Sequence, residues 1–253
     1  MNFLNVLRKE FTEQWRTRRL LIVAAVLVSF GLASPLLAKL IPDVFESVPG
    51  LPEGFADLIP EPSLTDAVSQ YVKNMSQFGI LLALLMSMGS VAQEKERGTA
   101  AMAVTNSIPH SAFLLAKFTA LAFTFFASLA IASLGCWYYT YLLFGPLPWV
   151  SFLALNGMIL LVFLVYIAVT ILCSTLARSQ TAAAGLAFCA LILVAGVGSL
   201  PRISEYFPGR LFSWGSALVM GGGESAWPAF WISLGAIAVA LLAAWLVFRR
   251  QEL

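Results

Sequence analysis

The residue types that most often do chemistry in proteins are scarce here, and none stands in a catalytic pattern. The single histidine, His110, follows Pro109, and neither the HExxH spacing of zinc proteases nor the GxSxG serine elbow is present. The nucleotide-binding loop GxxxxGKS/T is missing as well. Cys136, Cys173 and Cys189 stand in apolar stretches without the CxxC spacing of a metal or redox site. We therefore expect no catalytic residue, metal or cofactor in this chain.

The densest run of charged residues forms a pattern of its own. It consists of Glu94, Lys95, Glu96, Arg97, Gly98 and Thr99. Four alternating charges precede a glycine that can end a helix, and a short apolar stretch then leads to Pro109. Within the segment 93–112 this spacing predicts a short helix along the membrane surface, with its charges presented to the cytosol. A charged loop, which is common at inner membrane surfaces, explains the spacing alone equally well.

The composition indicates which elements must position these charges. Hydrophobic residues make up 60% of the chain and charged residues only 11%, whereas soluble domains have about 45–50% and about 25%. A soluble core of this size could not hide so much apolar surface, so a bilayer must surround it. The net charge of +2 gives no reason to expect a nucleic-acid partner.

Six stretches are long enough to cross the membrane, since about 20 apolar residues span its core. The six stretches are 20–41, 71–92, 113–144, 149–176, 181–200 and 228–248. Between the third and the fourth, the sequence Gly-Pro-Leu-Pro at 145–148 predicts a tight turn. The expected fold is an all-α integral membrane protein, with one transmembrane domain over 1–253.

The distribution of Lys and Arg sets the expected orientation. Of the 15 basic residues, only Lys39, Lys73, Arg202 and Arg210 fall on the side away from the N-terminus. Because basic residues concentrate in cytoplasmic segments, both termini are expected in the cytoplasm of a prokaryotic cell, with the spans in its inner membrane.

The N-terminal segment 1–19 carries an apolar stripe at helical spacing. The stripe consists of Leu4, Leu7, Phe11 and Trp15, and Lys9, Glu13 and Arg16 face away from it. Such a pattern predicts an interfacial helix in the headgroup plane. The alternative is that this segment extends the first span into the cytoplasm.

Two external segments are expected, at 42–70 and 201–227. The first is rich in proline and predicts a cap or loop, because proline interrupts helices. The second mixes aromatic residues with proline and glycine. It suits either a re-entrant hairpin or an interfacial loop with buried aromatic side chains.

The whole arrangement resembles permeases of the type-2 family of ATP-binding-cassette (ABC) exporters. In that family a charged stretch like 94–99, after the second span and before a proline-containing turn, forms a coupling helix that docks into a separate ATPase subunit. The likeness extends to the interfacial helix, the six spans, the semi-apolar segment before the last span and the basic end Phe248-Arg249-Arg250.

The resemblance implies a permease that forms the substrate path as a homodimer or with a homologous permease, driven by two ATPase subunits that bind ATP and Mg²⁺. It implies that the residues at 94–99 are the ATPase-coupling contacts. A nonenzymatic assembly or regulatory protein and an ion-coupled carrier are the alternatives. The transported substrate, and export as opposed to flipping, are left open.

Overall fold

The computed structural model describes residues 3–46, 61–98, 109–223 and 225–251, and these ranges contain helices and no strand. Six helices within them are long and apolar enough to cross a membrane, which confirms the expected all-α membrane fold. They are α2 (Arg19–Glu46), the run Leu64–Glu96, α7 (His110–Phe144), α8 (Trp149–Leu176), α9 (Gln180–Gly198) and α11 (Trp227–Arg249).

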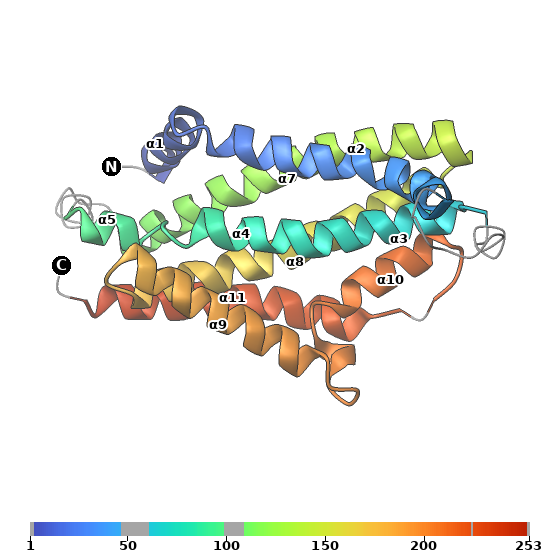
Figure 1. The fold of residues 1–253 in the computed structure, drawn as a ribbon. Coiled ribbons are helices and arrows are strands. Elements are labelled where there is room, and N and C mark those ends of the chain that lie inside the picture. Colours follow the sequence, from blue (N-terminus) through green and yellow to red (C-terminus); the bar gives the residue numbers. More distant parts are fainter. Residues whose placement is uncertain (1–2, 47–60, 99–108, 224, 252–253) are drawn as a thin grey trace.

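The six spans form one bundle in which α8 is the most enclosed helix (Figure 1). Helix α8 contacts α4 (Ile80–Ser87), α7, α9 and α11, whereas α2 packs mainly along α7. The N-terminus, the C-terminus and α5 (Ala92–Glu96) lie at the same end of the bundle (Figure 1). An even number of crossings requires this arrangement.

Helix α1 (Phe3–Arg16) is separate from α2. Arg18 has a φ of 57° between them, and α1 turns away from the axis of α2 (Figure 1). Since a left-handed residue breaks a helix, α1 is not an extension of the first span.

The second span begins earlier than the expected residue 71. Helix α3 (Leu64–Asn74) starts after Ser63, whose backbone N and Oγ donate to the carboxylate of Asp66 at 2.9 and 2.6 Å. Such a cap satisfies groups at the helix start. A π-helical turn, η2 (Met75–Gly79), then leads into α4, and the chain turns once more at 88–91 before α5.

Uncharged polar pairs fix α3 inside the bundle. The Tyr71 hydroxyl donates to Asn156 Oδ1 of α8 at 2.6 Å, and Asn74 Nδ2 donates to Ser34 Oγ of α2 at 2.9 Å. Where no water is available, buried polar groups must find partners in neighbouring helices. These bonds set the register of the second span against the first and the fourth.

The segment 201–227 contains two further helices, the 3₁₀ turn η3 (Ser204–Tyr206) and α10 (Arg210–Val219). Helix α10 packs against α8, and Gly215 lies so close that an added Cβ would be 2.6 Å from Leu155 Cδ1. Leu211, Phe212 and Trp214 are buried. This packing favours the re-entrant interpretation over a surface loop.

Gly31 allows the close approach of α2 to α7. A Cβ at this position would lie 2.7 Å from the carbonyl oxygen of Ala132, and a backbone atom cannot move aside like a flexible side chain. Small residues allow helices to pack tightly in membranes, where packing drives their association.

The substitution Gly31→Ala is expected to destabilise the protein by about 1–3 kcal/mol through overpacking. The measurement is the midpoint of thermal aggregation in detergent. The control is Gly157→Ala in α8, where a Cβ would meet open space; this change should leave the midpoint unchanged or raise it. Equal midpoints for the two variants would contradict the assigned contact.

Candidate functional site

The charged segment predicted from the sequence lies at the end of the bundle that carries both chain termini (Figure 1). Residues 92–96 form α5, and Arg97 and Gly98 follow it. Gly98 has a φ of 70°, which glycine adopts without strain. The segment thus bends where the sequence predicts. Thr99 and the apolar stretch after it lie outside the described residues.

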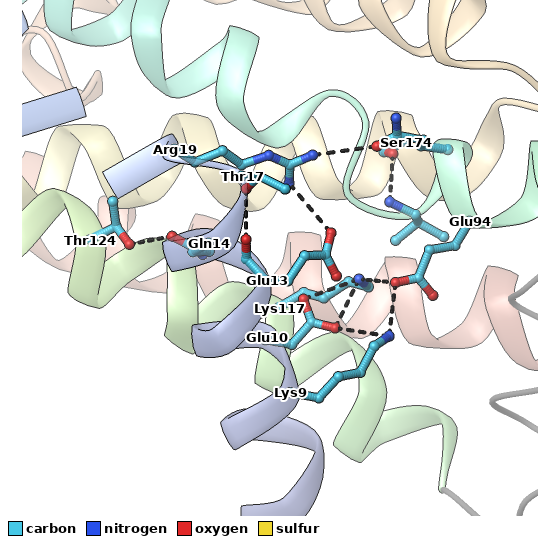
Figure 2. Close-up of polar contacts among 12 residues, drawn as sticks. Lys9, Glu10, Glu13, Gln14, Thr17, Arg19, Glu94, Lys117, Thr124 and Ser174 are labelled. Carbon is cyan, nitrogen blue, oxygen red and sulfur yellow. Dashed lines mark hydrogen bonds and ion pairs between the residues drawn. The ribbon is translucent and has the colours of Figure 1, made fainter. Parts of the chain in front are cut away.

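Lys117 of α7 is the centre of the polar contacts around α5. Its Nζ lies 3.0 Å from Glu10 Oε1 of α1 and 2.6 Å from Glu94 Oε1 of α5. Only 4% of the Lys117 side chain is exposed. Figure 2 shows the two carboxylates converging on this ammonium group from different helices. One buried cation therefore joins three elements that are distant in the sequence.

Lys9 completes the charge balance of this group. Its Nζ lies 3.2 Å from Glu94 Oε1 and 3.7 Å from Glu10 Oε1 (Figure 2). Burial acts to lower the pKa of Lys9, but the carboxylates of Glu94 and Glu10 outweigh it and raise the pKa above its usual value. We call Lys9, Glu10, Glu94 and Lys117 the ionic cluster; its two positive and two negative charges compensate each other.

Further contacts bind α1 to the bundle beside the ionic cluster. The Thr124 hydroxyl of α7 donates to Gln14 Oε1, and Phe11 packs edge-on against Phe123 with ring centroids 5.2 Å apart. Arg19 Nη2 donates to Gln93 Oε1 at 3.3 Å. Helix α1 is consequently attached to α7, and Arg19, the first residue of α2, attaches α2 to α5.

The opposite side of α5 is held by α8 and α9. Ser174 Oγ accepts hydrogen bonds from the backbone N of Val91 and Ala92 at 3.1 and 2.9 Å. Lys95 Nζ donates to the carbonyl oxygen of Thr175, and Glu96 Oε2 accepts from the backbone N of Gln180 at 3.1 Å. Helix α5 is therefore bonded to five helices, namely α1, α2, α7, α8 and α9. Among the described residues of the charged segment, Arg97 and Gly98 extend beyond these contacts.

Comparison with known proteins gives the class of this molecule. The model of the ABC-2 family transporter proteins matches residues 4–253. This chain belongs to that family. A relative in Bacillus subtilis (strain 168), the uncharacterized transmembrane protein YxlG, is 24% identical over 251 residues, covering 98% of this chain and 97% of YxlG. The chain is thus a membrane component of an ABC-2 transporter, and the family resemblance in the sequence is confirmed.

The apolar stripe of α1 is only partly covered in this permease. Leu4 and Trp15 are 70% and 69% exposed, whereas Leu7 and Phe11 are half-buried. The side of α1 that faces the bundle consists of Val6, Glu10 and Gln14. An exposed apolar edge beside a docked polar side suits a helix at the membrane surface.

The sequence analysis did not identify Glu10, Gln14, Lys117 or Ser174 as site residues. One feature of the sequence indicated a role for Lys117: it is an ionisable residue inside the predicted third span, 113–144. Such residues usually face the protein interior and pair there. Its partners could not be named, because they come from segments whose relative placement depends on the fold.

The site also contains three neighbouring carboxylates. The carboxylates of Glu10, Glu13 and Glu94 come within 4.8 Å of one another, yet the ammonium groups of Lys117 and Lys9 already supply positive charge there. His110 begins α7, and its ring packs edge-on against Phe248 at 5.4 Å.

Removing the charge of Lys117 should destabilise the permease. In Lys117→Met, Glu10 and Glu94 lose their buried partner, and the expected cost is about 3–5 kcal/mol. Thermal aggregation in detergent measures the loss. The matched control is Lys39→Met on the exposed surface of α2, which should change little. If both variants melt at the same temperature, the cluster does not stabilise the fold.

Proposed function

We propose that this chain is the permease subunit of an ATP-driven exporter or flippase, and that a separate ATPase subunit docks on α5 and the residues that follow it. The observation that carries this proposal is the bonding of α5 to α1, α2, α7, α8 and α9. A segment bonded to five helices can pass an applied force to all of them.

The contacts divide the charged segment into two functional parts. Glu94 and Lys95 point inward, to Lys117 and to the carbonyl oxygen of Thr175. Arg97 is exposed at the tip. In this proposal, the inward residues transmit movement, and Arg97 with the exposed Glu96 provides electrostatic contacts to the ATPase. ATP-driven closure of the ATPase would then displace α5 and the five helices together.

The partner subunits would supply the chemistry that the permease lacks. Two ATPase subunits would bind ATP and Mg²⁺, and the end of the bundle with α1, α5 and both termini would face the cytoplasm. The bias of basic residues toward that end supports this orientation in a bacterial inner membrane.

A second permease copy would complete the substrate path, with α9 at the contact. Only 11% of the membrane-spanning stretch of α9 is buried within the single chain. Gly185 and Gly196 face open space, so another helix could approach closely there. Gly31 does not serve this purpose, because Ala132 of the same chain occupies its surface.

The charge reversal Arg97→Glu should weaken docking of the ATPase by about tenfold, since like charges at an interface are repulsive. The measurement is the amount of the partner ATPase subunit that co-purifies with the permease, together with ATP hydrolysis by the complex. Arg97 is a cleaner test than Glu94, whose substitution would also disturb the ionic cluster.

The control for Arg97→Glu is Arg202→Glu, which makes the same charge change beyond the outer end of α9. This control should retain the ATPase. Normal retention and hydrolysis with Arg97→Glu would exclude Arg97 from the docking contact.

Cys189 allows a direct test of the α9 contact, because it is exposed on that helix whereas Cys136 and Cys173 are buried. Oxidation by copper phenanthroline in membranes should produce a covalent dimer through Cys189. The control is Leu246→Cys in a Cys189→Ser background, which places a thiol on the exposed surface of α11. A dimer in the control and none through Cys189 would assign the contact to another helix.

A further inference from the structure

A cavity of about 380 Å³ lies between α4, α8, α9 and the segment that contains α10. Arg210, Tyr166 and Ser213 contribute polar groups to its lining, and Ile80, Val162 and Val194 contribute apolar walls. We call this space the Arg210 cavity. It is distinct from the ionic cluster, which lies among α1, α5 and α7.

The cavity extends far into the bundle. Val162 lies near the middle of α8, Trp149–Leu176, and Ile80 lies near the middle of the span Leu64–Glu96. Helix α10 runs from the end of α9 toward the outer end of the bundle (Figure 1), so Arg210 stands at its deeper end. The sequence places Arg210 in an external segment, but the fold brings it beside residues at mid-membrane depth.

Within the described ranges, no carboxylate compensates the charge of Arg210. Among the residues whose placement is described, none forms an ion pair or side-chain hydrogen bond with it, and no acidic side chain lines the cavity. Within the same described part of the chain, the hydroxyl groups of Tyr166 and Ser213 have no hydrogen-bond partner either. A guanidinium and two hydroxyls therefore face the cavity as available donors, which is the donor set that an anion requires.

Lys117 and Arg210 differ in how their positive charge is compensated. Lys117 is a buried cation with two carboxylate partners, whereas Arg210 is a half-buried cation without one. A cation within membrane-spanning helices is costly, and such residues usually mark a site of function. An anionic ligand in the cavity would offset that cost.

The apolar walls of the Arg210 cavity limit the kind of anion that it can bind. Phe207 and Phe212 join the apolar residues of the spans around the polar end, so the lining is amphipathic. The volume is too small for a whole lipid but suits a headgroup with its first methylene groups. Ala195 and Ser199 line the cavity on α9 and are also exposed on the surface of the bundle, which gives acyl chains a route to the bilayer.

We propose that the Arg210 cavity binds the anionic headgroup of a membrane amphiphile, with the guanidinium on the charged group and the tails directed past α9 into the bilayer. This binding requires no ATP and no partner subunit, so its test is independent of the proposed coupling to the ATPase. If both hold, the class of cargo is an acidic lipid or a lipid-linked acid.

The test measures binding to the purified full-length permease in detergent micelles. Spin-labelled phosphatidylglycerol and phosphatidylcholine with identical tails serve as probes, and sodium phosphate serves as the soluble anion. The wild type should bind the phosphatidylglycerol probe about tenfold more tightly than the phosphatidylcholine probe, the preference that one charge-assisted contact supplies. Phosphate at millimolar concentration should not displace it.

Single substitutions distinguish binding in the Arg210 cavity from attraction to charge on the surface. Arg210→Gln should abolish the preference for phosphatidylglycerol, Arg210→Lys should keep part of it, and Arg202→Gln, on the exposed part of the same segment, should keep all of it. Ala195→Trp, which fills the cavity without changing charge, should weaken binding of the phosphatidylglycerol probe. Elution as a single symmetric peak from a sizing column verifies that each variant is folded.

Three results would overturn the proposal. The first is equal binding of the two lipid probes by the wild type. The second is an equal loss of preference in Arg202→Gln and Arg210→Gln, which would indicate general surface attraction. The third is displacement of phosphatidylglycerol by millimolar phosphate, which would indicate a site for a soluble anion.

Discussion

The contact of Lys117 with Glu10 and Glu94 is the interaction on which the end of the bundle with both chain termini depends. An unpaired ammonium at this depth would be strongly unfavourable, so the lysine requires both carboxylates to remain where they are. Because those carboxylates belong to α1 and α5, the buried charge fixes the two helices to α7. Lys9 balances the remaining negative charge, and the cluster is neutral as a whole.

Lys117, which is buried, and Arg210, which is half-buried, have different surroundings. At the end with α5, carboxylates compensate the cations, and helix α5 is also bonded to α8 and α9. Such a unit is suited to moving as one body. At the Arg210 cavity, donors face an apolar-walled space. This arrangement suits the binding of the anionic headgroup that we propose.

The sequence was sufficient for the parts of the fold that depend on composition and local spacing. Length and apolarity located all six spans, and glycine at 98 marked the bend after α5. The early start of α3 was missed, because five prolines in 42–70 concealed the single cap that Ser63 and Asp66 form. A sequence pattern cannot show when one helix cap outweighs the helix-breaking effect of the prolines around it.

The polar contacts required the tertiary structure. Lys117 and Glu10 are 107 positions apart, and no periodicity in either helix indicates that they meet. The stripe of Leu4, Leu7, Phe11 and Trp15 was visible in the sequence, but the polar side of α1 that docks on the bundle was not. Similarly, the depth of Arg210 follows from the packing of α10 on α8, which a list of basic residues by membrane side cannot show.

The central claim is that the ionic cluster holds α5 in the position that the ATPase recognises. A charge exchange tests it most directly, by measuring the ATPase subunit retained by Glu94→Lys, by Lys117→Glu and by the double variant. Each single reversal leaves the cluster with excess charge of one sign, and each should lose most of the ATPase. The double variant restores neutrality, and we expect it to regain most of the binding. A double variant that retains no more ATPase than the single variants would contradict the claim.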